Sequence, residues 1–213
     1  LRETEREFIT GYIERLKTNS IEERILYNVS EPRTIIKTVK DEESYEDKGK
    51  RLAEKFAEEV VAEAIDIRPY FKNLLTGKQY YSFDFGKKLA ELNGFNQNFV
   101  DNLISEVLKI ENEQHNISFL FGYLSALETD KKNDIFNFLI THKSSFAFNV
   151  LRFTEFSFEN VLKLIDLIKK HDIPSNRLEI IKYDVIKLEP VDLIKYFELI
   201  KNTENGYLII IDT

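Results

Sequence analysis

Three histidines are the first side chains to consider for catalysis or metal binding, because imidazole titrates near neutral pH and ligates zinc. They lie 27 and 29 residues apart, and no H-E-x-x-H motif occurs. A metal site would therefore need ligands brought together from distant parts of the chain. We interpret His115, His142 and His171 as surface residues at helix ends, and we predict no metal site.

Motifs for nucleotide and acyl chemistry are also missing from the sequence. The Gly77-Lys78 pair lacks the upstream glycine of a phosphate-binding loop. No G-x-S-x-G surrounds a serine, and we interpret Ser144 and Ser145 as caps that precede an apolar helix. Glu111 and Glu113 would lie on different sides of a helix. We therefore predict no catalytic residue, no cofactor and no enzymatic activity.

The densest unusual cluster is aromatic. Exposed aromatic rings could anchor a protein partner or stack on bases, but base stacking also needs interleaved basic residues, and only Lys143 and Arg152 lie near the cluster. Because the chain has no tryptophan or methionine, we favour core packing. The residues concerned are Phe146, Phe148, Phe153, Phe156 and Phe158, preceded by Tyr80, Tyr81, Phe83 and Phe85.

Charge and composition narrow the functional classes. A net charge of −7 and a pI near 5.2 disfavour binding to nucleic acid or to an anionic membrane. A hydrophobic content of 43% with four prolines and seven glycines favours a folded, helix-rich chain. No apolar run approaches the roughly 20 residues that span a bilayer, and the absence of cysteine fits a reducing compartment. We predict an all-α, cytoplasmic protein with no membrane partner.

Glycines recur along the chain at a nearly regular interval. GKRLAE at 49–54 returns as GKKLAE at 86–91, and GYIERL from Gly11 resembles GYLSAL from Gly122, so that Gly11, Gly49, Gly86 and Gly122 mark a period of 36 to 38. LKLIDLIKK at 162–170 and IKYFELIKN at 194–202 lie 32 residues apart. This loose period predicts one α-solenoid domain over 1–213, with about six helical hairpins and a period of 32–38. Each glycine is predicted to let neighbouring helices approach closely.

Caps and stops place the helices of these hairpins. Ser20 with Glu23, and Ser44 with Asp47, match the capping-box pattern. Residues suited to a first turn or a C-terminal cap are Pro69, Pro174, Pro190, Gly77 and Gly94. The predicted helices span 3–17, 20–29, 45–66, 69–76, 83–92, 96–110, 116–128, 130–142, 145–152, 157–170, 175–187 and 190–201. The polar stretch 41–50 is interpreted as a loop between hairpins rather than as a domain boundary.

Two of the predicted helices carry wide apolar faces, which need neighbours on two sides. We predict both to be inner helices between adjacent repeats. The apolar residues of the predicted helix 157–170 are Phe158, Val161, Leu162, Leu164, Ile165, Leu167 and Ile168. Those of the predicted helix 190–201 are Leu193, Ile194, Tyr196, Phe197, Leu199 and Ile200.

Residues 83–201 resemble a known family. The segments are FDFGKKLAEL, NISFLFGYLSALE, IFNFLI, SFENVLKLIDLIKKHDIP and LEPVDLIKYFELI. They are similar to the degenerate helical-repeat (HEAT- or TPR-like) regions of large bacterial STAND-type ATPases and anti-phage defence proteins. The resemblance implies an α-solenoid sensor that follows a nucleotidase and an effector domain and recognises a protein ligand. It implies no catalytic residue, because the matching motifs are structural in that family.

We therefore expect a scaffold or sensor that binds another protein on its superhelical surface. Because the sequence begins at Leu1, we expect a fragment of a larger protein whose other domains are further partners. The alternative is a small all-helical enzyme or ligand-binding protein with a pocket between helices. A nucleic-acid-binding helical repeat is a third interpretation, which the net charge disfavours.

Overall fold

The computed structural model describes residues 20–31, 45–111, 115–142, 144–152, 154, 156–204 and 206–212. Within these ranges the chain is all-helical, and its one extended contact is an isolated antiparallel bridge between Thr76 and His115. The predicted all-α class is therefore confirmed for this part of the chain. The chain divides into two compact units, Leu1–Ala126 and Leu127–Thr213, which are described separately. A single repeat domain over 1–213 stays a prediction.

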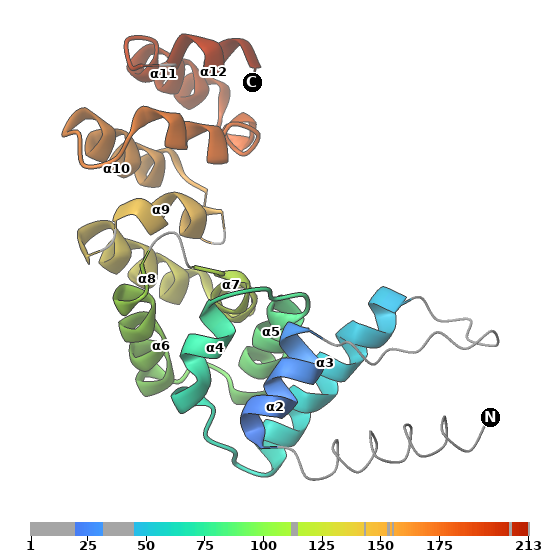
Figure 1. Cartoon of the computed structure of the whole chain (residues 1–213). Coiled ribbons are helices and arrows are strands. Elements are labelled where there is room, and N and C mark those ends of the chain that lie inside the picture. The colour runs from blue at the N-terminus through green and yellow to red at the C-terminus, as the bar shows by residue number, and fades with distance from the viewer. Residues whose placement is uncertain are drawn as a thin grey trace. The chain divides into compact units, whose positions relative to one another are not determined.

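The first unit is organised around α5. This helix lies between α3 and α7, while α4 contacts α6 and α7 (Figure 1). The elements are α2 (Ile21–Ile25), the π-helical turn η1 (Leu26–Ser30), α3 (Tyr45–Ala62), the 3-10 turn η2 (Arg68–Tyr70), α4 (Phe71–Leu75), α5 (Ser82–Asn93), α6 (Gln97–Lys109) and α7 (Ser118–Ser125). Large buried side chains in this unit include Phe56, Phe71, Leu74, Phe85, Leu89, Phe119 and Tyr123.

Local signals in the sequence fix several helix ends of this unit. The capping box is present: the Ser20 hydroxyl accepts from the Glu23 N–H at 3.3 Å, and the Glu23 carboxylate accepts from the Ser20 N–H at 3.1 Å. Gly94 ends α5 at φ 64°, and its N–H donates to the Ala90 carbonyl at 2.9 Å. The predicted helix 3–17 with Gly11, and the cap at Ser44, lie outside the described residues.

Gly86 and Gly122 lie where α5 and α7 pack together. A methyl group added at Gly122 would overlap the main chain of Phe83, and one added at Gly86 would overlap the carbonyl oxygen of Phe119. The two helices therefore touch backbone to backbone, and each supplies a glycine to the contact. Gly49 differs, because an added methyl group there would meet the ring of Tyr81.

The three glycines of the predicted repeat that lie within the described residues hold similar places in their helices. Gly86 and Gly122 are each the fifth residue of their helices, which begin at Ser82 and Ser118, and Gly49 is the fifth described residue of α3. These helices also pack in chain order, α3 on α5 and α5 on α7. The sequence spacing therefore corresponds to equivalent positions in consecutively packed helices.

The helices of the second unit stack in chain order. The helix α9 contacts α8 and α10, α10 contacts α11, and α11 contacts α12, which also touches η4 (Figure 1). The elements are α8 (Thr129–His142), α9 (Ser144–Leu151), α10 (Phe158–Lys169), the 3-10 turns η4 (Ser175–Ile180) and η5 (Val185–Lys187), α11 (Pro190–Ile200) and α12 (Gly206–Asp212).

Several predicted helices differ from the structure. The range 175–187 forms two 3-10 turns rather than one α-helix, and Pro174 precedes them in an extended conformation instead of opening a helical turn. The range 20–29 continues from α2 into a π-helical turn. The helix α12 was not expected, because a short apolar run that follows a glycine lacks helical periodicity.

The apolar faces predicted for α10 and α11 have different outcomes. The helix α10 lies between α9 and α11 and buries Val161, Leu164, Ile165 and Ile168, as an inner helix should. For α11 the prediction is wrong in part, since Ile194 is 63% exposed. The buried residues of α11 are Tyr196 and Ile200.

Asp184 joins the 3-10 region to the end of α9. Its carboxylate is 11% exposed and accepts from Arg152 Nε at 2.9 Å and from Lys187 Nζ at 2.6 Å. Both cations remain more than half exposed, so solvent still hydrates them. The buried partner of this cluster is therefore the carboxylate.

Replacing Gly122 with alanine should force α5 and α7 apart. We expect Gly122→Ala, and equally Gly86→Ala, to lower the free energy of unfolding by about 1–3 kcal/mol through overpacking, despite the better helix propensity of alanine. Gly77→Ala is the control, because an added methyl group meets no atom within 4 Å there and only the positive φ is strained. Urea unfolding measures all three variants, and an unchanged Gly122→Ala would contradict the backbone contact.

Removing the Asp184 charge should destabilise the second unit. We expect Asp184→Asn to lower the free energy of unfolding by about 1–2 kcal/mol, because the two cations lose a charged acceptor. The loss stays moderate, because water still hydrates both cations. Asp192→Asn is a matched control, since its bond to Lys195 at 2.9 Å is a surface contact within α11. Thermal unfolding followed by circular dichroism compares the two; equal shifts would show that Asp184 is an ordinary surface acid.

Candidate functional site

The structure separates the three histidines. His142 is the last residue of α8, with its Nδ1 2.9 Å from the Phe138 carbonyl, and His171 follows α10 at φ 61°, so both lie at helix ends as expected. His115 is instead half-buried, in the bridge to Thr76, with Nε2 3.2 Å from the Val107 carbonyl. Within the residues that the structure describes, no group of three or more His, Cys, Asp or Glu side chains could hold a metal ion.

The serine and aromatic predictions are partly corrected. Ser144 and Ser145 begin α9 instead of preceding it. Phe85 and Phe148 are fully buried, which confirms core packing for them, whereas Tyr80 is 64% exposed. The side chains of Phe146 and Phe153 lie outside the description.

Three helix ends of the first unit line an open surface cavity of about 370 Å³, which we call the asparagine cavity. One wall follows the end of α3, a second is the end of α5, and a third is the first turn of α6. Buried Val60 and Leu89 contribute its apolar floor. The full lining is Val60, Val61, Ala64, Ile65, Asp66, Ile67, Arg68, Leu89, Asn93, Asn96, Asn98 and Phe99.

The wall after α3 depends on an unusual turn. Ala64 adopts φ 52°, a conformation that normally selects glycine, and the Ile65 N–H donates to the Val60 carbonyl at 2.9 Å. The chain therefore reverses directly after α3 and places Asp66 and Arg68 beside the cavity. A non-glycine residue in this conformation is locally strained, and such residues cluster at binding sites.

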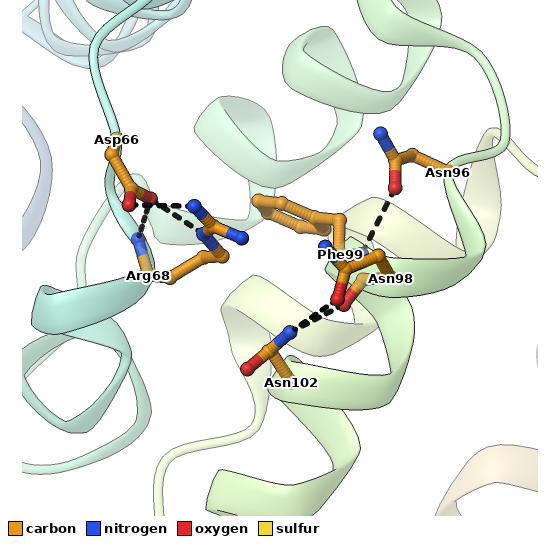
Figure 2. A network of polar contacts seen from close by, with 6 residues as sticks. All are labelled: Asp66, Arg68, Asn96, Asn98, Phe99 and Asn102. Atoms are coloured by element: carbon orange, nitrogen blue, oxygen red, sulfur yellow. Dashed lines mark hydrogen bonds and ion pairs between the residues drawn. The ribbon is translucent and has the colours of Figure 1, made fainter.

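Asp66 and Arg68 form a fixed ion pair on this wall. Arg68 donates from Nε to Oδ1 at 2.7 Å and from Nη2 to Oδ2 at 2.8 Å, and its main-chain N–H reaches Oδ1 at 3.1 Å. This hydrogen bonding lowers the pKa of Asp66 and raises the pKa of Arg68. In Figure 2 the guanidinium lies between the Asp66 carboxylate and the ring of Phe99.

The asparagines of the opposite walls are held from within α6 and its cap. Asn96 is the N-cap, and its Oδ1 accepts from the Phe99 N–H at 3.0 Å. Asn102 donates from Nδ2 to the carbonyl of Asn98 at 2.7 Å and to its Oδ1 at 2.9 Å (Figure 2). These bonds fix the side chains of Asn96 and Asn98 through their oxygen atoms.

Phe99 connects the cavity to the core of the first unit. Its ring stacks on Tyr123, with centroids 4.9 Å apart and planes at 23°, and meets Phe71 edge to face at 5.0 Å. Tyr123 is buried, and its hydroxyl lies 3.4 Å from the Gly94 carbonyl at the end of α5. The cavity wall is thus supported by a packed aromatic layer.

A second cavity of about 520 Å³ lies in the same unit, beside the π-helical turn. Its walls include Leu26, Ser30, Lys72 and Gln79. The Gln79 amide accepts from Ser30 Oγ at 2.9 Å and donates to two main-chain carbonyls, so it is occupied within the fold. This cavity also carries the charged side chains of Lys72 and Lys78, whereas the ionisable lining residues of the asparagine cavity are paired with each other.

The asparagine cavity offers hydrogen bonds and apolar contact for binding. Sequence reasoning did not identify Arg68, Asn93, Asn96 or Asn98, although the segment LNGFNQNF at 92–99 carries a signal: three asparagines and a glutamine between two apolar helices. The structural-repeat glycines predicted from the sequence do not line it. The predicted absence of catalysis and cofactors stays a prediction.

Comparison with family models, curated proteins and solved structures found no match. None of the helices in the described ranges has the length and apolar content that a membrane crossing requires.

The buried phenol of Tyr123 should make stability depend on alkaline pH. Burial raises the pKa of Tyr123 from 10.0 to about 12. The unfolded chain then loses this proton near pH 10 while the folded chain keeps it, so this contribution is complete below pH 10 and is lost as the pH rises towards 12. Tyr123→Phe should remove that part of the loss and change stability little at pH 7. Urea unfolding at pH 8 and pH 11 tests this; identical losses in both proteins would contradict it.

Proposed function

We propose that the chain is a helical-repeat module that binds another protein. The observation that carries the proposal is the equivalent placement of Gly49, Gly86 and Gly122 in helices that pack in chain order. Stacked equivalent helices build extended surfaces suited to protein recognition. The ordered stacking of α8 to α12 within the second unit supports the same architecture. A solenoid of about six hairpins over 1–213 is part of this proposal.

We also propose a place for the module in a larger protein. The resemblance of residues 83–201 to the repeat regions of STAND-type ATPases favours a sensor that follows a nucleotidase, with no catalysis of its own. In that arrangement the repeat surface recognises a protein ligand in the cytoplasm, and the other domains respond. The neutral, amide-lined cavity in the first unit is consistent with a recognition surface.

Binding to a partner is the direct test of the module. The purified chain serves as bait in its native host under stress or infection, and each captured protein is then purified and titrated by calorimetry. We expect one partner with a saturable 1:1 isotherm and a dissociation constant of about 1 μM or tighter, in the range of specific interfaces. A heat-unfolded bait is the control. A monomeric chain that binds no purified candidate would contradict the proposal.

A small-molecule-binding protein is the second candidate. The volume of the asparagine cavity, about 370 Å³, falls within the range of ligand pockets. A thermal-shift screen with metabolites at millimolar concentration distinguishes this candidate. A saturable rise in melting temperature that Asn98→Ala abolishes would support a small ligand over a protein partner.

A further inference from the structure

The asparagine cavity is locally neutral in a chain of net charge −7. Asp66 and Arg68 are the ionisable residues of its lining, and they are paired with each other. A charged ligand therefore gains little from the local charge. The acidic chain also repels an anion, and although it attracts a cation, a cation would meet the hydrogen-bond donors described next. The lining accordingly favours an uncharged polar ligand.

The uncommitted polar groups of the cavity are mainly donors. Arg68 uses Nε and Nη2 on its carboxylate partner, which leaves Nη1. Asn96 and Asn98 use their side-chain oxygens to accept bonds from α6, which leaves the Nδ2 groups. In the described part of the chain, none of these three nitrogens donates a hydrogen bond. A matching ligand must present acceptors, and carbonyl oxygen is the uncharged acceptor that peptides supply.

The other features of the lining suit an extended peptide. The amide of Asn93 is also uncommitted among the described residues and offers both a donor and an acceptor. The half-buried side chains of Val61, Ile65 and Phe99 supply apolar surface above the buried Val60 and Leu89. An extended main chain presents one carbonyl and one N–H per residue and directs its side chains alternately to opposite sides. One such side chain can pack on the apolar lining while the main chain forms hydrogen bonds with the polar side chains of the walls.

We propose that the asparagine cavity binds an extended, uncharged peptide segment of the partner protein. Arg68 Nη1 and the Nδ2 groups of Asn96 and Asn98 donate to main-chain carbonyl oxygens of the peptide, and one small apolar side chain of the peptide packs on the apolar lining. This inference rests on the proposed function and names the part of the partner that the module recognises.

The test uses a displayed library of random 12-residue peptides, selected on the whole chain. Enriched peptides are synthesised and titrated against the wild type, Asn98→Ala, Arg68→Gln and the control Asn137→Ala, which removes an exposed asparagine from α8. Loss of one neutral hydrogen bond corresponds to about 3- to 10-fold weaker binding. We expect such a loss for Asn98→Ala, a larger loss for Arg68→Gln, which removes a charged donor and leaves the Asp66 carboxylate unpaired, and no change for Asn137→Ala. Circular dichroism checks the fold of each variant, and Asn96→Ser, which keeps the helix cap, replaces any variant that unfolds.

Each outcome decides the inference. Enriched uncharged peptides whose binding weakens in the cavity variants alone support it. Peptides that bind all variants equally overturn it and leave the proposed protein-binding function standing. Selection of charged peptides overturns the uncharged peptide as occupant. So does a titration with adenosine, used as an uncharged small-molecule probe, that perturbs the Asn98 amide resonances when no peptide is selected. No binding of any peptide overturns this inference, and the partner titration then decides the proposed function separately.

Discussion

The first unit depends on the contact between α5 and α7 at Gly86 and Gly122, where neither helix has a side chain to hold the backbones apart. This close approach stacks the rings of Phe85 and Phe119, with centroids 5.7 Å apart and planes at 29°. The ring of Phe85 also stacks on Phe56, with centroids 5.4 Å apart, and the ring of Phe119 contacts Phe71, with centroids 6.1 Å apart. Since Phe71 also touches Phe99, the wall of the asparagine cavity is connected to the same aromatic core. A change at the helix contact would therefore reach the candidate site through packed rings.

The sequence allowed a good prediction of the all-α class and of most helices, because caps and apolar periodicity act over short distances. The Ser20 capping box and the glycine end of α5 at Gly94 are of this kind. The 3-10 turns at 175–187 were not predictable in the same way. Their apolar residues, such as Leu178, Ile181 and Val185, have the spacing of an α-helix. However, Asp184 in this region pairs with Arg152, which lies 32 residues earlier in the chain, and local spacing does not indicate such a contact. The exposure of Ile194 likewise depends on which helices pack against α11, and the sequence of α11 alone does not determine this.

The candidate site was much less predictable than the fold. Asparagine has no diagnostic motif, and Asn93, Asn96 and Asn98 lie at the end of α5 and at the start of α6, where amides commonly serve as caps. Their relation to Arg68 arises from the turn at Ala64, which the sequence does not mark with a glycine. Histidines and serines, which do have diagnostic motifs, directed attention to parts of the chain that the structure does not bring together. Tertiary packing, not local spacing, assembles this cavity.

The internal pairing of Asp66 with Arg68 also has a kinetic consequence. A recognition surface that keeps its cation neutralised cannot steer a ligand by long-range attraction, so encounter is governed by diffusion and orientation, with association rate constants of about 10⁵–10⁶ M⁻¹s⁻¹. The association of the uncharged peptide proposed above should also depend little on ionic strength, because that ligand carries no net charge for the field of the chain to act on. Discrimination between ligands would then reside in residence time, set by how well the donors of the cavity are satisfied once the ligand is seated.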